Sequence, residues 1–211
     1  MLKIGVTGGI GAGKSIICRV FHILGVPVYN ADERARALME ENQEVKQNLL
    51  KAFGNEVFRD GRPDRKALAS LVFGNMDALN EINRIIHPAV RSDFFSWLGE
   101  HKNEPYVIKE AAILFETGSW REMDGNILVT APVEIRTGRI MKRDGVTREE
   151  VLRRMENQWT DEKKIPLAGV VIKNDDSGPV LPVLLGLHAE LSRGELPAAF
   201  GSGADAGKDM N

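Results

Sequence analysis

The sequence has little of what secreted, membrane-spanning or nucleic-acid-binding proteins need. Its 211 residues include one cysteine, Cys18, so no disulfide can form within the chain. There is no run of about 18 apolar residues to form a transmembrane helix, and the N-terminus does not resemble a signal peptide. The net charge of −2 gives no electrostatic reason to expect binding to nucleic acid or a membrane. These absences predict a cytoplasmic, globular protein.

The length suits one domain, which we expect to cover residues 1–200. The final segment, 201–211, is rich in Gly, Ala, Asp and Ser and is expected to be a disordered tail. Before that tail the chain shows no internal repeat.

The first 41 residues predict a strand, a glycine loop, a helix, a second strand and a second helix. Residues 2–7 and 26–29 are short apolar runs, as in buried parallel strands. Between them, residues 14–24 place Ile17 and Phe21 on one face of a helix that Gly25 ends. This βαβ order implies a parallel sheet and an α/β fold.

The rest of the chain predicts a long helical stretch and then a return to strands. Residues 44–101 are mostly helical, with breaks at Gly54, at residues 60–63 and at His87-Pro88. We interpret this stretch as a helical insertion. Further strands are expected at 106–109, 126–129 and 169–173, and further helices at 132–142, 146–159 and 177–193.

A phosphate-binding loop is the most specific signal. The residues Gly8-Gly9-Ile10-Gly11-Ala12-Gly13-Lys14-Ser15 match G-x-x-x-x-G-K-[ST] in full, and they follow a predicted strand and open a predicted helix. In such a loop, backbone N–H groups and the helix N-terminus face the phosphates of a nucleoside triphosphate. Lys14 would reach the β and γ phosphates, and the Ser15 hydroxyl would hold Mg²⁺.

The class of nucleotide protein follows from other features. A guanine-reading switch needs Asn/Thr-Lys-x-Asp, and the chain contains no Asn-Lys or Thr-Lys pair. A mechanical ATPase usually carries an apolar strand that ends in Asp, whereas residues 107–110 read Val-Ile-Lys-Glu. The helical insertion favours a kinase, because an acceptor must be enclosed and water kept out.

Asp32 is the best candidate on the acceptor side. It follows the second predicted strand, and ligands of parallel α/β sheets gather at the carboxyl ends of strands. A carboxylate there could accept the proton of an attacking hydroxyl. The alternative is that Asp32 only favours a helix N-terminus, although Asn30, with Glu33 three residues later, already resembles a capping box.

Several basic residues have two interpretations. Arg136, Arg139 and Arg143 share one face of a predicted helix. These arginines could stabilise the charge of phosphoryl transfer. Alternatively, they could form a solvated helix face whose charge is balanced by nearby acidic residues. His87 could serve the site or simply stand where Pro88 ends a helix.

Taken together, the motifs resemble the dephospho-coenzyme A kinase family over about residues 1–195. The Asp-Gly-x-x-x-Arg, His-Pro and Leu-Phe-Glu elements are more specific than the phosphate loop. The matching residues are, in chain order, 7–15, Ala31-Asp32, Phe53-Gly54, 60–65, Leu68, Val72-Phe73, His87-Pro88, 113–116, Arg139, Arg143-Asp144, Gln158 and Asn174.

The resemblance implies transfer of phosphate from ATP, with Mg²⁺, to the ribose 3′-hydroxyl of dephospho-CoA. It implies a P-loop kinase fold: about five parallel strands flanked by helices, an acceptor-binding insertion at 33–103 and a lid at 138–160. It assigns ATP binding to residues 8–16, catalytic roles to Lys14, Asp32, Arg139 and Arg143, and acceptor binding to Asp32, Arg65, His87 and Glu116.

The chain departs from the family pattern at several positions. Asn30 stands where the family commonly has a first Asp, so Asp32 is the only carboxylate of that pair, and Ile16 stands where Thr is frequent. Ala111-Ala112 replaces a common proline, and Gly169 a common Asp. Two alternatives stay open: a nucleoside or nucleoside-monophosphate kinase, and a nucleotide-binding regulatory protein without transfer activity.

Overall fold

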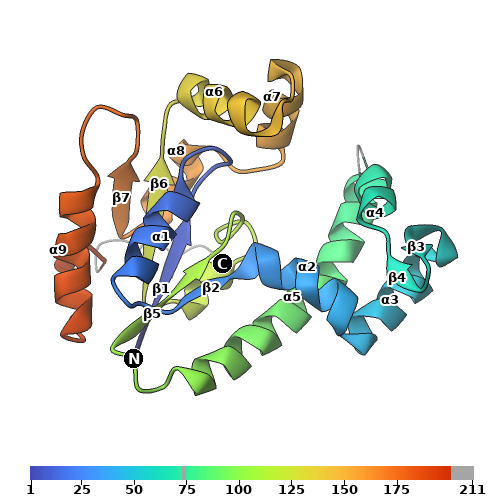
Figure 1. The fold of residues 1–211 in the computed structure, drawn as a ribbon, viewed down its shortest axis with the longest axis horizontal. Coiled ribbons are helices and arrows are strands. Elements are labelled where there is room, and N and C mark those ends of the chain that lie inside the picture. The colour runs from blue at the N-terminus through green and yellow to red at the C-terminus, as the bar shows by residue number, and fades with distance from the viewer. Residues whose placement is uncertain (73–74, 201–211) are drawn as a thin grey trace. The chain divides into compact units, whose positions relative to one another are not determined.

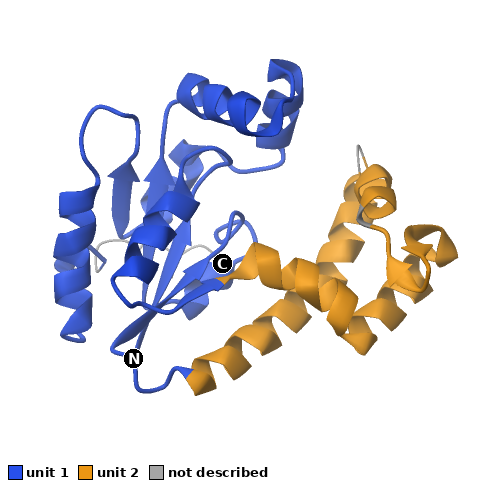
Figure 2. Ribbon diagram, in the orientation of Figure 1, with its two compact units in different colours: residues 1–29, 101–211 blue, residues 30–100 orange. Residues whose placement is uncertain are grey.

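The computed structural model of the chain describes residues 1–72 and 75–200, so the predicted tail at 201–211 lies outside the described residues. The chain forms two compact units (Figure 2): unit 1 contains residues 1–29 and the chain from residue 101 onward, and unit 2 is Asn30–Glu100. In the described parts of the chain, no helix combines the length and the apolar character needed to cross a membrane.

Unit 1 is built on a five-stranded parallel sheet, as the sequence predicts (Figure 1), and its strand order is β2-β5-β1-β6-β7. In the register, Ile4 pairs with Ile108 of β5 on one side and with Gly125 of β6 on the other. The strands are β1 (Leu2–Thr7), β2 (Val28–Asn30), β5 (Tyr106–Glu110), β6 (Gly125–Thr130) and β7 (Val170–Lys173).

Two helices cover one face of this sheet, α1 (Lys14–Ile23) and α9 (Leu181–Ser192). Ile4 and Val6 of β1 point into the apolar core under these helices, where they meet Phe21 and Leu184. All four side chains are fully buried, so they supply the hydrophobic free energy that holds α1 in place behind the phosphate loop.

The opposite face of β1 packs against the segment that follows β5. A Cβ atom on Gly5 would lie 2.6 Å from Leu114 Cδ2 and 3.1 Å from Met123 Cγ, so only glycine allows this close approach. The segment ends in the short 3₁₀ helix η2 (Ser119–Glu122). Residues 111–116 are thereby held close to the sheet.

A helical segment follows β6 and returns to β7. Gly145, in a left-handed conformation, ends α6, and a capping box between Thr147 and Glu150 starts α7. The elements are α6 (Val133–Asp144), α7 (Arg148–Glu156), α8 (Asp161–Lys164) and the 3₁₀ helix η3 (Ile165–Leu167). The sequence pattern predicts α6 and α7 but not α8.

Unit 2 is mainly helical. Asn30 caps α2 as predicted, because its side chain accepts a 3.1 Å hydrogen bond from the Glu33 N–H. Arg34 of α2 forms a two-pronged ion pair with Asp93, at 2.8 and 2.9 Å. The elements are α2 (Ala31–Glu41), α3 (Gln43–Phe53), η1 (Asn55–Val57), β3 (Phe58–Arg59), β4 (Arg62–Pro63), α4 (Arg65–Val72) and α5 (Met76–Glu100).

Of the predicted helix breaks in unit 2, the one at residues 60–63 is confirmed and the one at His87-Pro88 is corrected. Helix α5 runs through His87 and Pro88, so the prediction that a helix ends there is wrong. Pro88 removes one hydrogen bond, but the buried side chains of Ile86, Val90 and Phe94 hold the helix on both sides of it. Residues 58–63 form the two-stranded sheet β3-β4, in which Asp60 and Gly61 both have positive φ, as in a tight hairpin turn.

Candidate active site

The phosphate loop joins the end of β1 to the start of α1. Gly13 adopts a left-handed conformation (φ 98°) just before Lys14 begins the helix. A Cβ on Gly8 would collide with the carbonyl of Val129, so the loop also needs glycine for close packing. The helix N-terminus therefore directs its first N–H groups toward the loop, where an anion would be favoured.

Three side chains from distant parts of the chain hold the loop from outside. Asn174 Nδ2 donates a 2.8 Å hydrogen bond to the carbonyl of Ala12, and Arg139 Nη1 donates a 3.5 Å bond to the carbonyl of Gly11. Gln158 Oε1 accepts a 2.8 Å bond from the Ile10 N–H. These three hydrogen bonds support the loop in this conformation.

Lys14 and Ser15 follow this loop. Lys14 Nζ donates a 2.9 Å hydrogen bond to the Gly8 carbonyl, so the ammonium group lies across the loop. Ser15 Oγ donates a 3.0 Å bond to Oε1 of Glu110, the last residue of β5. Ile16, which replaces a common threonine, is 63% exposed on the same first turn.

Glu110 is a site residue that the sequence prediction missed. It is a carboxylate at the carboxyl end of a strand next to β1, only 6% exposed. In the sequence, the Val-Ile-Lys-Glu run at 107–110 counts only against a mechanical ATPase, whose strand usually ends in Asp. Glutamate at this position provides the same charge one methylene further from the backbone.

The hydroxyl of Ser15 and the carboxylate of Glu110 fit a magnesium ion. Both are oxygen ligands, and Mg²⁺ in kinases needs only one or two protein ligands besides substrate phosphates and water. No group of three or more His, Cys, Asp or Glu side chains suited to a metal occurs in residues 1–72 and 75–200. The arrangement therefore suits a metal that arrives with a nucleotide better than a permanently bound one.

Cys18 lies one helical turn after Lys14 and is 3% exposed. Burial raises the pKa of its thiol, and the carboxylate of Glu110 raises it further, while Lys14 opposes the shift. The thiol therefore stays protonated at neutral pH, as expected for a cysteine of the core.

The residues predicted on the acceptor side fall into both units. Asp32 is half-buried in the first turn of α2, and His87 is half-buried within α5. Arg65 begins α4, but its side chain lies outside the part of the chain that the structure describes. The acceptor-binding roles of these three residues stay predictions.

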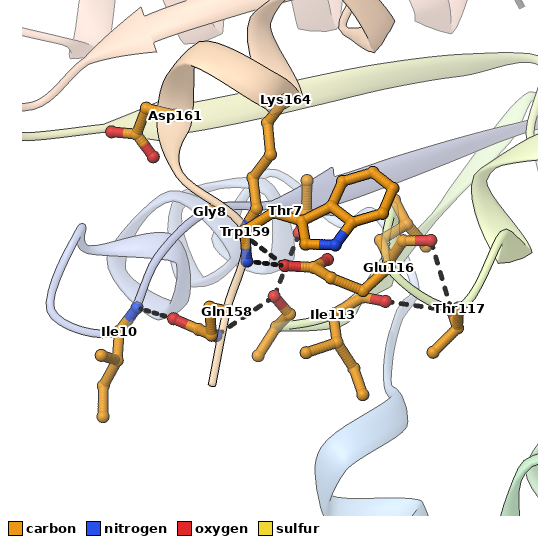
Figure 3. Close-up of polar contacts among 12 residues, drawn as sticks. Thr7, Gly8, Ile10, Ile113, Glu116, Thr117, Gln158, Trp159, Asp161 and Lys164 are labelled. Carbon is orange, nitrogen blue, oxygen red and sulfur yellow. Dashed lines mark hydrogen bonds and ion pairs between the residues drawn. The ribbon is translucent and has the colours of Figure 1, made fainter. Parts of the chain in front are cut away.

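Glu116, the fourth of these residues, belongs to unit 1 and is tied to the protein itself. Its Oε1 lies 2.9 Å from Lys164 Nζ and accepts a 2.9 Å hydrogen bond from the Trp159 N–H. Only 13% of the Glu116 side chain is exposed, and Lys164 is completely buried. Figure 3 shows this carboxylate between Lys164 and the chain segment at Gln158 and Trp159.

The arginines of α6 have three different surroundings. Arg136 is buried, with its guanidinium packed on Gly9 of the loop and Nη1 3.6 Å from Asp161 Oδ2. Arg139 reaches the loop and pairs with Asp176 at 2.8 Å. Arg143 is 63% exposed and pairs with its neighbour Asp144. The single arginine face that the spacing predicts is therefore divided between the loop and the surface.

Comparisons with known proteins agree on one family. The sequence profile described as dephospho-CoA kinase matches residues 2–179 of this chain. A Dephospho-CoA kinase of Bacteroides fragilis is 36% identical over 190 residues, which cover 90% of this chain and 93% of that protein. A Dephospho-CoA kinase of Chlorobaculum tepidum is 40% identical over 181 residues, covering 82% and 86%.

Two solved structures are similar to this chain over most of their length. A crystal structure of a Thermus thermophilus protein matches with a TM-score of 0.78 and 37% identity, covering 91% of this chain and 97% of that one. The structure of the dephospho-CoA kinase from Campylobacter jejuni matches with a TM-score of 0.66 and 26% identity, covering 91% and 98%.

Proposed function

The chain belongs to the dephospho-CoA kinase family, and on this premise we propose that it transfers the γ-phosphoryl group of ATP to the 3′-hydroxyl of the ribose in dephospho-CoA. The products are coenzyme A and ADP, as in the last step of coenzyme A biosynthesis. The observation that carries the proposal is the phosphate loop, with Lys14, Ser15 and Glu110 gathered at the carboxyl ends of β1 and β5.

In this proposal, ATP is bound by residues 8–16. The amides of the loop and the N-terminus of α1 face the phosphates, and Lys14 exchanges its bond to the Gly8 carbonyl for one to a phosphate oxygen. Ser15 and Glu110 would hold Mg²⁺, which neutralises part of the charge on the phosphates when it is bound.

The proposed acceptor group is Asp32. The 3′-oxygen forms a bond to the γ phosphorus, the bond from that phosphorus to the bridging oxygen of ADP breaks, and the proton of the hydroxyl passes to the Asp32 carboxylate. Arg65, His87 and Glu116 are proposed to bind the rest of dephospho-CoA. Asp32, Arg65 and His87 all belong to unit 2, Asn30–Glu100.

The proposed lid is the segment 138–160, which contains most of α6 and all of α7. Arg139 is proposed to stabilise charge on the phosphates, and its contact with the Gly11 carbonyl supports this because it keeps the guanidinium at the loop. Arg143 would have to exchange Asp144 for a phosphate oxygen. A cytoplasmic location is part of the same proposal.

An acceptor-comparison assay tests the function. ADP release is followed with ATP, Mg²⁺ and one of three acceptors: dephospho-CoA, AMP or adenosine. We expect turnover with dephospho-CoA alone, with coenzyme A identified by mass. Turnover with AMP or adenosine instead would overturn the substrate, and ADP release that is independent of any acceptor would overturn the transferase.

A further inference from the structure

A partly buried polar cluster of Glu116, Gln158 and Lys164 connects the end of the lid to the phosphate loop (Figure 3). The fully buried Nζ of Lys164, in α8, forms its ion pair with Oε1 of Glu116 at 2.9 Å. The same oxygen accepts the Trp159 N–H. One carboxylate oxygen thus holds both α8 and the residue directly after Gln158.

The side-chain amide of Gln158 forms hydrogen bonds through both its oxygen and its nitrogen. Oε1 accepts the 2.8 Å bond from the Ile10 N–H, and Nε2 donates a 3.4 Å bond to the carbonyl of Ala112. Ala112 lies four residues before Glu116, in the segment that packs beneath β1. The Gln158 side chain therefore bridges the phosphate loop and the same segment that carries the partner of Lys164.

The Glu116–Lys164 pair is poorly explained by stability alone. Burying an ammonium and a carboxylate is costly, and an apolar pair of similar volume often stabilises a fold as well or better. The second oxygen of Glu116, Oε2, is buried and has no hydrogen-bond partner in the described part of the chain. A pair that leaves a buried oxygen unsatisfied, at the junction of lid and loop, fits a positioning function.

We propose that Lys164 is a positioning residue for phosphoryl transfer: through Glu116 and Trp159 it holds Gln158 on the Ile10 amide and so keeps the C-terminal end of the lid closed against the phosphate loop. This rests on the proposed kinase function. The Ile10 N–H is one of the loop donors, so holding it fixes the side of the loop where the chain re-enters from α7.

Loss of this positioning should allow water to compete with the ribose hydroxyl for the γ-phosphoryl group. In transfer, the ribose 3′-oxygen bonds to the γ phosphorus as the bond to ADP breaks, and coenzyme A and ADP form in equal amounts. If water attacks instead, its oxygen bonds to phosphorus, its proton goes to solvent, and the products are ADP and inorganic phosphate. A loosened lid end admits water while the loop still binds ATP, so the ratio of ADP to coenzyme A rises.

The test measures ADP and coenzyme A together, with melting temperature and ATP affinity, for wild type and three variants. Lys164→Met alone leaves Glu116 charged and buried, so it should lower the melting temperature. Lys164→Met with Glu116→Gln removes both charges at nearly constant volume and keeps an acceptor for the Trp159 N–H. Gln158→Ala removes the bridge without touching a buried charge.

We expect the double variant and Gln158→Ala to bind ATP nearly as wild type does. Their ratio of ADP to coenzyme A should rise roughly tenfold, the size expected for loss of one hydrogen bond in a partly buried site. The matched control is Arg193→Met, which breaks the exposed ion pair with Glu195 and should leave the ratio unchanged.

Either of two results would overturn this inference and leave the proposed kinase function untouched. The first is a double variant that regains the wild-type melting temperature and also keeps the wild-type product ratio, because the pair would then only support the fold. The second is a wild-type ratio in Gln158→Ala. Wild-type protein that forms no coenzyme A would instead overturn the proposed function, and the inference with it.

Discussion

The hydroxyl of Ser15 and the carboxylate of Glu110 are joined by a hydrogen bond of 3.0 Å, although 95 residues separate them in the chain. The bond connects the first turn of α1 to the end of β5. Pairing of β5 with β1, at Val6 and Glu110, brings the two side chains to the same edge of the sheet. Glu110 thereby takes the position that an acidic strand end occupies in many phosphate-loop proteins.

Glu110→Gln should raise the Mg²⁺ concentration needed for half-maximal activity. Loss of one negative charge from the pair should weaken the metal by roughly 10- to 100-fold. ATP affinity in the presence of a chelator should stay unchanged, because the loop amides bind the phosphates. The measurement is turnover against Mg²⁺, with Glu44→Gln, the same change on an exposed carboxylate of α3, as the control. If the Mg²⁺ dependence of turnover is the same in Glu110→Gln and wild type, Glu110 is not a metal ligand.

Lys14→Ala should abolish most turnover. Loss of a positive group that meets developing charge costs roughly 10²- to 10³-fold in kcat at comparable sites. The fold should survive, since Lys14 is half-exposed and its Nζ donates a 2.9 Å hydrogen bond to the Gly8 carbonyl of the loop itself. Steady-state kinetics with circular dichroism checks both points, and Lys142→Ala on the exposed side of α6 is the control. A kcat within a few-fold of wild type would contradict the loop assignment.

Asp32→Asn should leave ATP affinity intact and lower kcat by roughly 10²- to 10⁴-fold, the usual contribution of a general base. Asparagine keeps the size of the side chain, and Asn30 still caps the helix. The measurement is ATP binding by titration beside kcat with saturating dephospho-CoA. Weakened ATP binding with near-normal kcat would remove Asp32 from the acceptor side.

Substitutions of Asn30 test whether the departure from the family pattern at this position matters. Asn30→Ala should lower the free energy of unfolding by about 1 kcal/mol, because the Glu33 N–H loses its cap. Asn30→Asp should keep the wild-type stability, since aspartate caps equally well. Urea denaturation of both variants measures this. A kcat for Asn30→Asp within a few-fold of wild type is expected if Asp32 serves as the only base, and a large gain would show that the second carboxylate matters.

Asp161 should make stability depend on pH. Burial raises the pKa of this carboxyl, with Arg136 and Lys164 opposing the shift. The folded state therefore holds a proton that the unfolded state releases between the ordinary pKa of 3.8 and the raised value. Across that window, this residue's contribution to the free energy of unfolding falls as the pH rises.

Asp161→Asn removes this dependence. The difference in unfolding free energy between variant and wild type should shift in favour of the variant as the pH rises through the window, and then stay constant. Any part of the difference in unfolding free energy that is the same at every pH comes from the changed contact between residue 161 and Arg136. Denaturation at a series of acidic to neutral pH values measures the slope, and a difference that does not vary with pH would contradict the raised pKa.

Local signals in the sequence predict much of the fold and the centre of the site. The phosphate loop, the cap at Asn30 and the helix stop at Gly25 are recognisable because the residues involved are adjacent and their backbone geometry follows from residue type. The apolar runs predict the parallel sheet because strands buried on both faces are apolar throughout.

Tertiary structure determines the contacts that complete the site. Ser15 with Glu110, Ile10 with Gln158 and Glu116 with Lys164 are pairs separated by 48 to 148 residues, which periodicity cannot connect. Pro88 shows the same limit, since packing of α5 outweighs a residue that locally ends helices. The sequence by itself determined which segment forms the phosphate-loop motif. The packing of distant segments decided which side chains hold that loop, because only folding brings these groups within hydrogen-bonding distance.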